Sequence, residues 1–160
     1  MKNQRQNLPA WSKKDEVLSA LEKHQVVVIS GETGCGKSTQ VPQFILDDWL
    51  EKQCSDDAEI SDHINIVCTQ PRKISAIGVS ERVADERAER IGHTVGYQIR
   101  LESRMSAYTR LLFCTTGILL RRLENDPLLN SVTHILVDEV HERSIERLIT
   151  IFKKSINVSV

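Results

Sequence analysis

A glycine-rich stretch early in the chain combines the residue types that bind phosphate. It fits the pattern G-x-x-x-x-G-K-[ST]. Glycines let consecutive backbone N–H groups point inward around an anion, because no side chain stands in the way. Lys37 brings a positive charge to the β- and γ-phosphates, and the Ser38 hydroxyl completes the coordination of a magnesium ion. We therefore expect ATP-type phosphates to bind at Gly31, Glu32, Thr33, Gly34, Cys35, Gly36, Lys37, Ser38 and Thr39.

An acidic pair at the end of a later apolar run supplies the second half of this chemistry. We expect Asp138 to bind the magnesium ion and Glu139 to orient, or accept a proton from, the water that attacks the γ-phosphate. His141 lies just beyond the acids and is expected to relay the nucleotide state to the rest of the domain. Alone, a solvated acidic strand end would explain this pattern equally well. Its separation from the phosphate loop favours catalysis, with Ser38, Asp138 and Glu139 around the metal.

The elements that must position these residues alternate between strands and helices. Apolar runs predict strands at 25–30, 64–69, 94–99, 110–114 and 134–137. The β-branched run Val26 to Ile29 is expected to be buried on both faces. The alternation predicts an α/β fold, with a mostly parallel sheet and helices on both faces. The carboxyl ends of the strands then gather four polar segments at one edge: 31–38, 69–72, 115–117 and 138–141.

Helical patterns fill the intervals between these strands. They predict helices at 12–24, 37–51, 72–90, 117–123 and 144–154, with a surface loop at 52–63. Ser12 is a candidate N-cap of the first helix, and Pro42 should cause a local irregularity in the second. Gly92 is expected to end the third helix. The core-facing residues of that third helix are predicted to be Ile74, Ile77, Val83 and Ala84.

Length and composition fit one compact domain. The 160 residues are 40% hydrophobic and 27% charged, as in an ordinary globular protein. No apolar stretch approaches membrane-spanning length, and the first residues lead into no signal-peptide hydrophobic region. The 4 cysteines form no C-x-x-C pair, which argues against a zinc site or a disulfide framework. We therefore expect a reducing intracellular compartment, cytoplasmic or nuclear. A reactive thiol at Cys35 is an open alternative, because a helix N-terminus favours thiolate.

The formal net charge of -1 conceals an uneven distribution of charge. Acidic residues dominate between Gln43 and Asp62, whereas arginine and lysine outnumber acids between Gln70 and Arg122. A local basic face suited to nucleic acid is therefore plausible, although a solvated helix face shows the same bias.

Five separated segments together resemble the first motor lobe of the DEAH/RHA (DExH-box) group of superfamily 2 RNA helicases. The resemblance covers roughly Leu8 to Ser144, and the segments occur in the family's order. They are Gly31 to Gln40 (GETGCGKSTQ), Thr69 to Arg72 (TQPR), Gly96 to Ser103 (GYQIRLES), Cys114 to Gly117 (CTTG) and Asp138 to Arg143 (DEVHER).

The resemblance implies a RecA-like P-loop NTPase lobe that binds ATP and Mg²⁺ and grips the backbone of single-stranded RNA. It also implies that Arg82 stacks on adenine, a contact compatible with loose base selectivity. Without the resemblance, Arg82 would be a solvated helix residue, and Thr115 and Thr116 would be strand-end or capping residues. The RNA contacts that it implies are Thr69, Arg72, Lys73, Arg100, Thr115, Thr116 and Gly117.

Two features depart from the family pattern. Ile145 to Thr150 stands where the family has an acidic residue followed by a Phe-Leu-Leu-type run. The sequence also stops before the Ser-Ala-Thr motif and the second lobe, which carries arginines that contact the γ-phosphate in this family. We therefore expect residues 1–160 to form a single ATP-binding lobe, which binds nucleotide better than it hydrolyses it.

Three functions remain open from the sequence. The first is an ATP-dependent RNA helicase of which this chain is the first motor lobe, with hydrolysis coupled to unwinding or translocation in the full-length protein. The second is a truncated module that binds nucleotide or RNA without turnover. The third is a P-loop kinase or transporter ATPase, which would leave segments 69–72 and 114–117 without a role.

Overall fold

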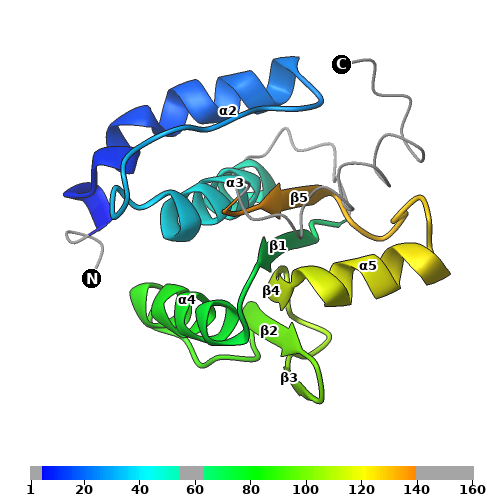
Figure 1. The fold of residues 1–160 in the computed structure, drawn as a ribbon. Coiled ribbons are helices and arrows are strands. Elements are labelled where there is room, and N and C mark those ends of the chain that lie inside the picture. Colours follow the sequence, from blue (N-terminus) through cyan, green and yellow to red (C-terminus); the bar gives the residue numbers. More distant parts are fainter. Residues whose placement is uncertain (1–4, 55–62, 140–160) are drawn as a thin grey trace.

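The computed structural model describes residues 5–54 and 63–139, and in this part of the chain the strands form one sheet (Figure 1). The strand order is β3-β2-β4-β1-β5. Neighbouring strands run parallel, except that β3 pairs antiparallel with β2. The prediction of a mostly parallel sheet is confirmed. The strands are β1 (Ile66–Gln70), β2 (Val95–Ile99), β3 (Glu102–Arg104), β4 (Leu111–Thr115) and β5 (His134–Val137).

Helices cover both faces of this sheet, as the sequence predicts. Two of them, α3 and α4, pack on one face through Leu46 and Val83, and the chain's α5 packs on the other through Leu119. In Figure 1, α4 and α5 lie on opposite sides of the strands. The helices are η1 (Pro9–Lys13, a 3-10 helix), α2 (Lys14–Lys23), α3 (Lys37–Gln53), α4 (Lys73–Glu86) and α5 (Thr116–Asn125).

Alternation along β1 explains how the strand serves both layers. Ile66 and Cys68 belong to the core beneath α3 and α4, whereas Val67 belongs to the core beneath α5. All five residues of β1 are buried, because β4 and β5 flank the strand and helices cover its two faces. The prediction of a buried strand at 64–69 is therefore confirmed by β1.

The same prediction is wrong for residues 25–30. The structure assigns no strand there, and the side chains of Val26 and Val28 are 63% and 89% exposed. None of the described strands pairs with this segment, and β5 forms the sheet edge with half-buried residues. A β-branched run becomes a strand only where a neighbour accepts its backbone hydrogen bonds, so its propensity alone was insufficient. The phosphate loop consequently does not follow a strand of this sheet.

Helix boundaries differ from the predictions where caps were inferred from residue type. Ser12 lies inside η1 and donates to the Pro9 carbonyl, and Lys13 is the N-cap of α2. The helix α3 runs unbroken through Pro42 and extends to Gln53, into the predicted loop. Residues 55–62, and the predicted helix at 144–154, lie outside the described part of the chain.

The end of α4 also differs. This helix stops at Glu86, so Gly92 does not end it as predicted, and Ala88, two residues after the helix, has a positive φ of 56°. Gly92 instead forms a turn, donating from its N–H to the Val95 carbonyl. Ile74 is 85% exposed in the first turn of α4, so its predicted place in the core is wrong. The strand β3 was not predicted, because its three residues are all exposed and carry no apolar alternation.

Ile74 is exposed whereas Phe113 of the central strand β4 is buried, so truncating these two side chains should reduce stability by different amounts. Phe113→Ala should destabilise the 160-residue chain by about 3–5 kcal/mol, because Phe113 is fully buried between the sheet and its helices. Ile74→Ala should change the free energy of unfolding by less than about 0.5 kcal/mol. Urea unfolding followed by circular dichroism measures both, and equal losses would contradict the assigned burial.

Candidate nucleotide and nucleic-acid site

The glycine-rich loop ends in a left-handed turn that opens α3. Gly34 and Gly36 have φ values of 81° and 100°, and Gly36 is the N-cap of this helix. A Cβ atom at Gly36 would lie 3.2 Å from both a Leu8 methyl group and Gln40 Cγ. Glycine is thus required there for the backbone conformation and for space. The loop places the positive N-terminal end of a 17-residue helix beside its own N–H groups, an arrangement that attracts anions.

Residues 5–11, which precede α2, contact both this loop and α3. The Ala10 N–H donates to the Cys35 carbonyl at 3.0 Å, and the Trp11 ring packs edge-on against Phe44 of α3 with centroids 5.6 Å apart. Arg5 is 6% exposed and lies over the Trp11 ring while it pairs with Asp47 of α3 at 2.9 Å. The loop is therefore held from outside as well as by its own turn.

Lys37 is folded back onto the loop that it follows. Its ammonium donates to the carbonyls of Gly31 and Glu32, the second at 2.9 Å, and Cys35 Sγ lies 3.6 Å away. A phosphate that enters the loop competes with these two carbonyls for the lysine. A phosphate is an anion whereas a backbone carbonyl is neutral, so the bond between two ionised partners favours the phosphate. Residues 31–36 thus form a loop that leads directly into α3, as predicted. The role of residues 31–39 in nucleotide binding stays a prediction.

The second candidate group lies where the parallel strands end. The Gln70 amide donates to Asp138 Oδ2 at 2.7 Å, and Asp138 Oδ1 accepts the N–H of Glu139 at 2.9 Å. Glu139 has a φ of 54°, a conformation that non-glycine residues adopt infrequently. Asp138 is thus fixed in orientation by β1, which the sequence reasoning missed. The signal available was position, because parallel neighbours bring the residues after β1 and β5 to one edge.

The predicted RNA contacts gather at the same edge. Arg72 and Lys73 are exposed at the start of α4, Thr115 is the N-cap of α5, and Arg100 is exposed where β2 turns into β3. Gly117 is exposed in the first turn of α5, whereas Thr116 is buried. The side chain of Thr69 is also buried and turns toward the Leu136 carbonyl at 3.5 Å. Thr69 therefore supports the edge from inside the sheet.

The structure says less about the remaining site predictions, which concern Arg82, His141 and the placement of Lys37 opposite Asp138. Arg82 lies on α4 with 58% of its side chain exposed. His141 lies outside the described residues. Lys37 binds its own loop and Asp138 binds Gln70, so the opposed placement of Lys37 and Asp138 around one nucleotide stays a prediction.

A buried polar cluster connects α3 with α4. Glu86 accepts hydrogen bonds from Gln40 and Gln43 of α3, both at 2.9 Å, and from Arg82 Nε at 2.8 Å. Burial alone would raise the pKa of Glu86, but the bonds from Gln40, Arg82 and Gln43 outweigh it and lower that pKa. Glu86 is therefore a buried carboxylate, a role that sequence reasoning missed because an acid in a helix usually faces water.

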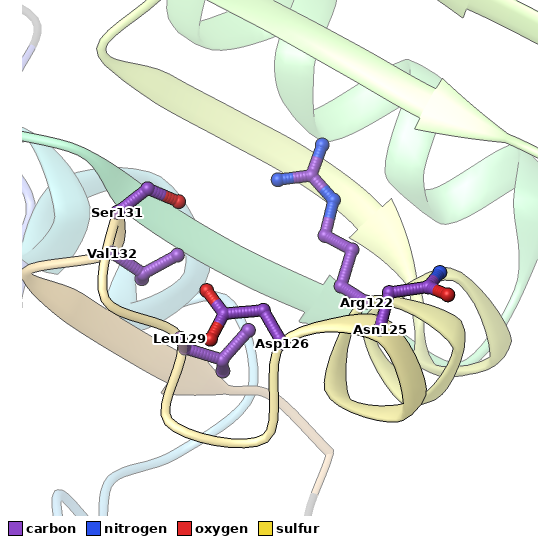
Figure 2. A pocket seen from close by; sticks show the side chains of 6 residues that line it. All are labelled: Arg122, Asn125, Asp126, Leu129, Ser131 and Val132. Carbon is purple, nitrogen blue, oxygen red and sulfur yellow. The ribbon is translucent and has the colours of Figure 1, made fainter.

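A shallow pocket lies elsewhere, at the end of α5 (Figure 2). Its volume is about 260 Å³, and it contains none of the predicted site residues. Asp126 on its rim accepts the Asn130 N–H at 2.9 Å, which closes the turn between α5 and β5. The lining residues are Arg122, Asn125, Asp126, Leu129, Ser131 and Val132.

The four cysteines differ in burial, and the two buried thiols have raised pKa values. All four cysteines are free, and burial raises the pKa of Cys114 to about 12 and that of Cys68 well above its usual value. Within residues 5–54 and 63–139, no cluster of three His, Cys, Asp or Glu residues is arranged to hold a metal. No helix in these ranges is long and apolar enough to cross a membrane.

Comparison with known proteins identifies the group to which these features belong. The family model described as DEAD/DEAH box helicase matches residues 4–157, almost the whole chain. The chain belongs to the DEAD/DEAH box helicase family. The α/β sheet agrees with the RecA-like domain of such helicases.

Individual relatives are DExH-box proteins. The chain is 65% identical over 143 residues to the human protein named putative ATP-dependent RNA helicase DHX57, covering 89% of the chain and 10% of that protein. It is 58% identical over 139 residues to Arabidopsis thaliana DExH-box ATP-dependent RNA helicase DExH1, covering 87% and 13%. It is 49% identical over 162 residues to human ATP-dependent DNA/RNA helicase DHX36, covering 98% and 16%. The chain thus spans about a tenth to a sixth of these relatives.

The backbone conformation and close contacts of Gly36 predict that replacing it lowers the stability of the chain. Gly36→Ala should destabilise the chain by about 1–3 kcal/mol, because alanine resists a φ of 100° and its methyl group meets Leu8 and Gln40. Gly78→Ala is the matched control: Gly78 lies inside α4 with open space around it, so alanine should stabilise by about 0.5–1 kcal/mol. Thermal unfolding of both variants is the measurement, and a neutral Gly36→Ala would contradict the loop geometry.

The lowered pKa of Glu86 predicts an acid-sensitive contribution to stability. A carboxyl whose pKa is lower in the folded state stabilises it above the unfolded value, about 4.3, and loses that contribution as pH falls through the folded pKa. Wild-type chain should therefore lose more unfolding free energy than Glu86→Gln between about pH 6 and about pH 3. Glu81→Gln, on the exposed side of α4, should retain the wild-type loss. Urea unfolding at several pH values measures this, and parallel profiles for wild type and Glu86→Gln would contradict it.

Proposed function

We propose that this chain is the ATP-binding motor lobe of an ATP-dependent RNA helicase. The observation that carries the proposal is the left-handed glycine turn at Gly36, which opens α3 inside a DEAD/DEAH box helicase domain. In this role residues 31–39 surround the triphosphate, and Lys37 moves from the loop carbonyls to the β- and γ-phosphates. Hydrolysis is coupled to unwinding or translocation in the full-length protein.

The oxygen ligands available suit magnesium. Ser38 offers a hydroxyl, and Asp138 and Glu139 offer carboxylates, which are the hard donors that Mg²⁺ prefers. Because Mg²⁺ keeps several waters and shares the phosphates of its nucleotide, a dense cluster of protein ligands is unnecessary. When bound, the metal neutralises charge on the phosphates. Gln70 holds Asp138 in one orientation, and Glu139 orients the attacking water or accepts its proton.

The strand-end residues bind the RNA backbone in this proposal. Arg72, Lys73 and Arg100 provide cations, and Thr115 begins a helix whose N–H groups suit phosphate. Contacts of this kind carry no base information, as a motor that moves along RNA requires. The hydrogen bond between Gln70 and Asp138 joins this segment to the proposed metal site. Nucleotide binding and RNA binding are therefore linked through one short side-chain contact.

A second lobe in the full-length protein completes the catalytic site. The short coverage of the relatives supports this, since the chain corresponds to about a tenth of the human DHX57 protein. Arginines supplied from such a lobe would stabilise the transferred phosphoryl group. The free cysteines support a reducing cytoplasmic or nuclear compartment.

The alternative function is a nucleotide- or RNA-binding module without turnover. Full multiple-turnover ATPase activity from the 160-residue chain alone would exclude this alternative. The helicase proposal is tested in the full-length protein by ATPase activity and strand unwinding with and without RNA. RNA stimulation and unwinding are expected, and the absence of both would overturn the proposal. Phosphorylation of a small molecule would instead support a P-loop kinase.

Lys37 provides the sharpest substitution test of nucleotide binding. Lys37→Ala should weaken Mg-ATP binding to this chain by about tenfold or more, because it removes the cation that contacts the terminal phosphates. Lys23→Ala, at the exposed end of α2, removes the same charge and should leave binding unchanged. Calorimetric titration measures both variants, and equal affinity for wild type and Lys37→Ala would contradict the proposed role of the loop.

A further inference from the structure

The buried polar cluster formed by Glu86, Gln40 and Gln43 joins α3 to α4, and it contains none of the predicted site residues. Glu86 is 8% exposed, and Gln40 and Gln43 are fully buried beside it. All three side chains are polar, and they occupy the contact between the helix that follows the phosphate loop and the helix that carries Arg82. Burying a carboxylate and two amides costs free energy that an apolar contact would avoid. Such a cluster therefore calls for an explanation beyond packing.

The two oxygens of Glu86 face different partners. Oε2 accepts both glutamine amides, which fixes the carboxylate to the first two turns of α3. Oε1 accepts Arg82 Nε at 2.8 Å. Gln40 follows Thr39 directly and donates to its hydroxyl, and Gln43 donates to the Thr39 carbonyl. One carboxylate thus connects the end of the phosphate loop to Arg82.

Arg82 stays largely exposed although its Nε donates to Glu86. The Arg82 side chain is 58% exposed although the side chain of its partner Glu86 is only 5% exposed. The Nε–H bond restricts the orientations open to this guanidinium, and an exposed guanidinium face can stack on a flat aromatic ring. An unrestrained surface arginine would pay side-chain entropy to adopt one orientation for such a ring.

We propose that Glu86, anchored by Gln40 and Gln43, is the positioning residue that sets Arg82 at a fixed place relative to the phosphate loop. The cluster then sets the position of the base-contacting residue, Arg82, relative to the loop that binds the triphosphate of the same nucleotide. This inference rests on the proposed function, because it assumes that residues 31–39 bind the phosphates and that Arg82 meets the base. It adds that Arg82 of α4 is held, through Glu86, by the two glutamines of α3, the helix that follows the phosphate loop.

The test compares two ligands that differ in the base. Mg-ATP carries base and phosphates, whereas inorganic tripolyphosphate with magnesium carries phosphates alone. Glu86→Gln should weaken Mg-ATP binding by about five- to tenfold and leave tripolyphosphate binding within about twofold of wild type. In an Arg82→Ala background, Glu86→Gln should have no further effect on Mg-ATP, because the residue through which Glu86 acts is gone. Calorimetric titration of the 160-residue chain measures all four proteins.

Two further variants separate this role from simple stabilisation of the fold. Glu81→Gln makes the same acid-to-amide change one residue before Arg82, on the exposed side of α4, and should bind both ligands as wild type does. Gln43→Met keeps the size of the side chain but removes one anchor of Glu86, so it should weaken Mg-ATP selectively. If Glu86→Gln does not fold, Gln43→Met carries the test.

Each outcome decides a different statement. A selective loss of Mg-ATP affinity that disappears in the Arg82→Ala background supports the positioning role. Equal weakening of Mg-ATP and tripolyphosphate, or a Glu86→Gln effect that persists without Arg82, overturns this inference while the proposed function stands. A wild-type chain that binds neither ligand overturns the proposed function, and the positioning role with it.

Discussion

The parallel pairing of β1 with both β4 and β5 is the constraint on which the candidate site depends. In this register Thr69 lies opposite Cys114 and Val137, so the chain leaves all three strands at one level. The residues that follow the strands are thereby brought to one edge, although they are far apart in the sequence. Gln70 and Asp138 can form their 2.7 Å hydrogen bond only because this register aligns the two strand ends.

A second constraint acts on the other half of the site. The phosphate loop is held by the left-handed turn at Gly36 and by the segment that contains Ala10 and Trp11, independently of the sheet. The connection to the rest of the molecule runs through α3, which packs on the same sheet face as α4 and shares the buried Glu86 cluster with it. The loop and the strand edge are thus positioned by different interactions, and a nucleotide that contacts both would couple them.

The sequence predicted those parts of the molecule whose local pattern and environment agree. The strand β1 and the helix α3 have strong patterns and lie in the surroundings that those patterns describe. Residues 25–30 have an equally strong strand pattern, yet no described strand accepts their hydrogen bonds. Ile74 matched the period of α4, but it lies in the first turn of this helix and its side chain is exposed. The sequence pattern alone does not show whether a neighbouring strand or a core is available to a segment.

The polar contacts could not be predicted for a related reason. Gln70 and Glu86 are residue types that usually face water, and their roles depend on residues 68 and 43 positions away in the chain. Only the packed structure shows that both side chains are buried and hydrogen-bonded to residues distant in the sequence. The residues that resembled known motifs were found because their chemistry is local, as in the glycine loop.

A single nucleotide site shared by the loop and the strand edge is tested most directly by amide mapping of the ¹⁵N-labelled chain by NMR while Mg-ATP is added. Resonances of residues 31–38 are expected to shift together with those of Gln70, Asp138 and Glu139, because one nucleotide contacts the loop and the strand edge. Shifts confined to the pocket at the end of α5, or an unchanged spectrum at saturating Mg-ATP, would contradict it.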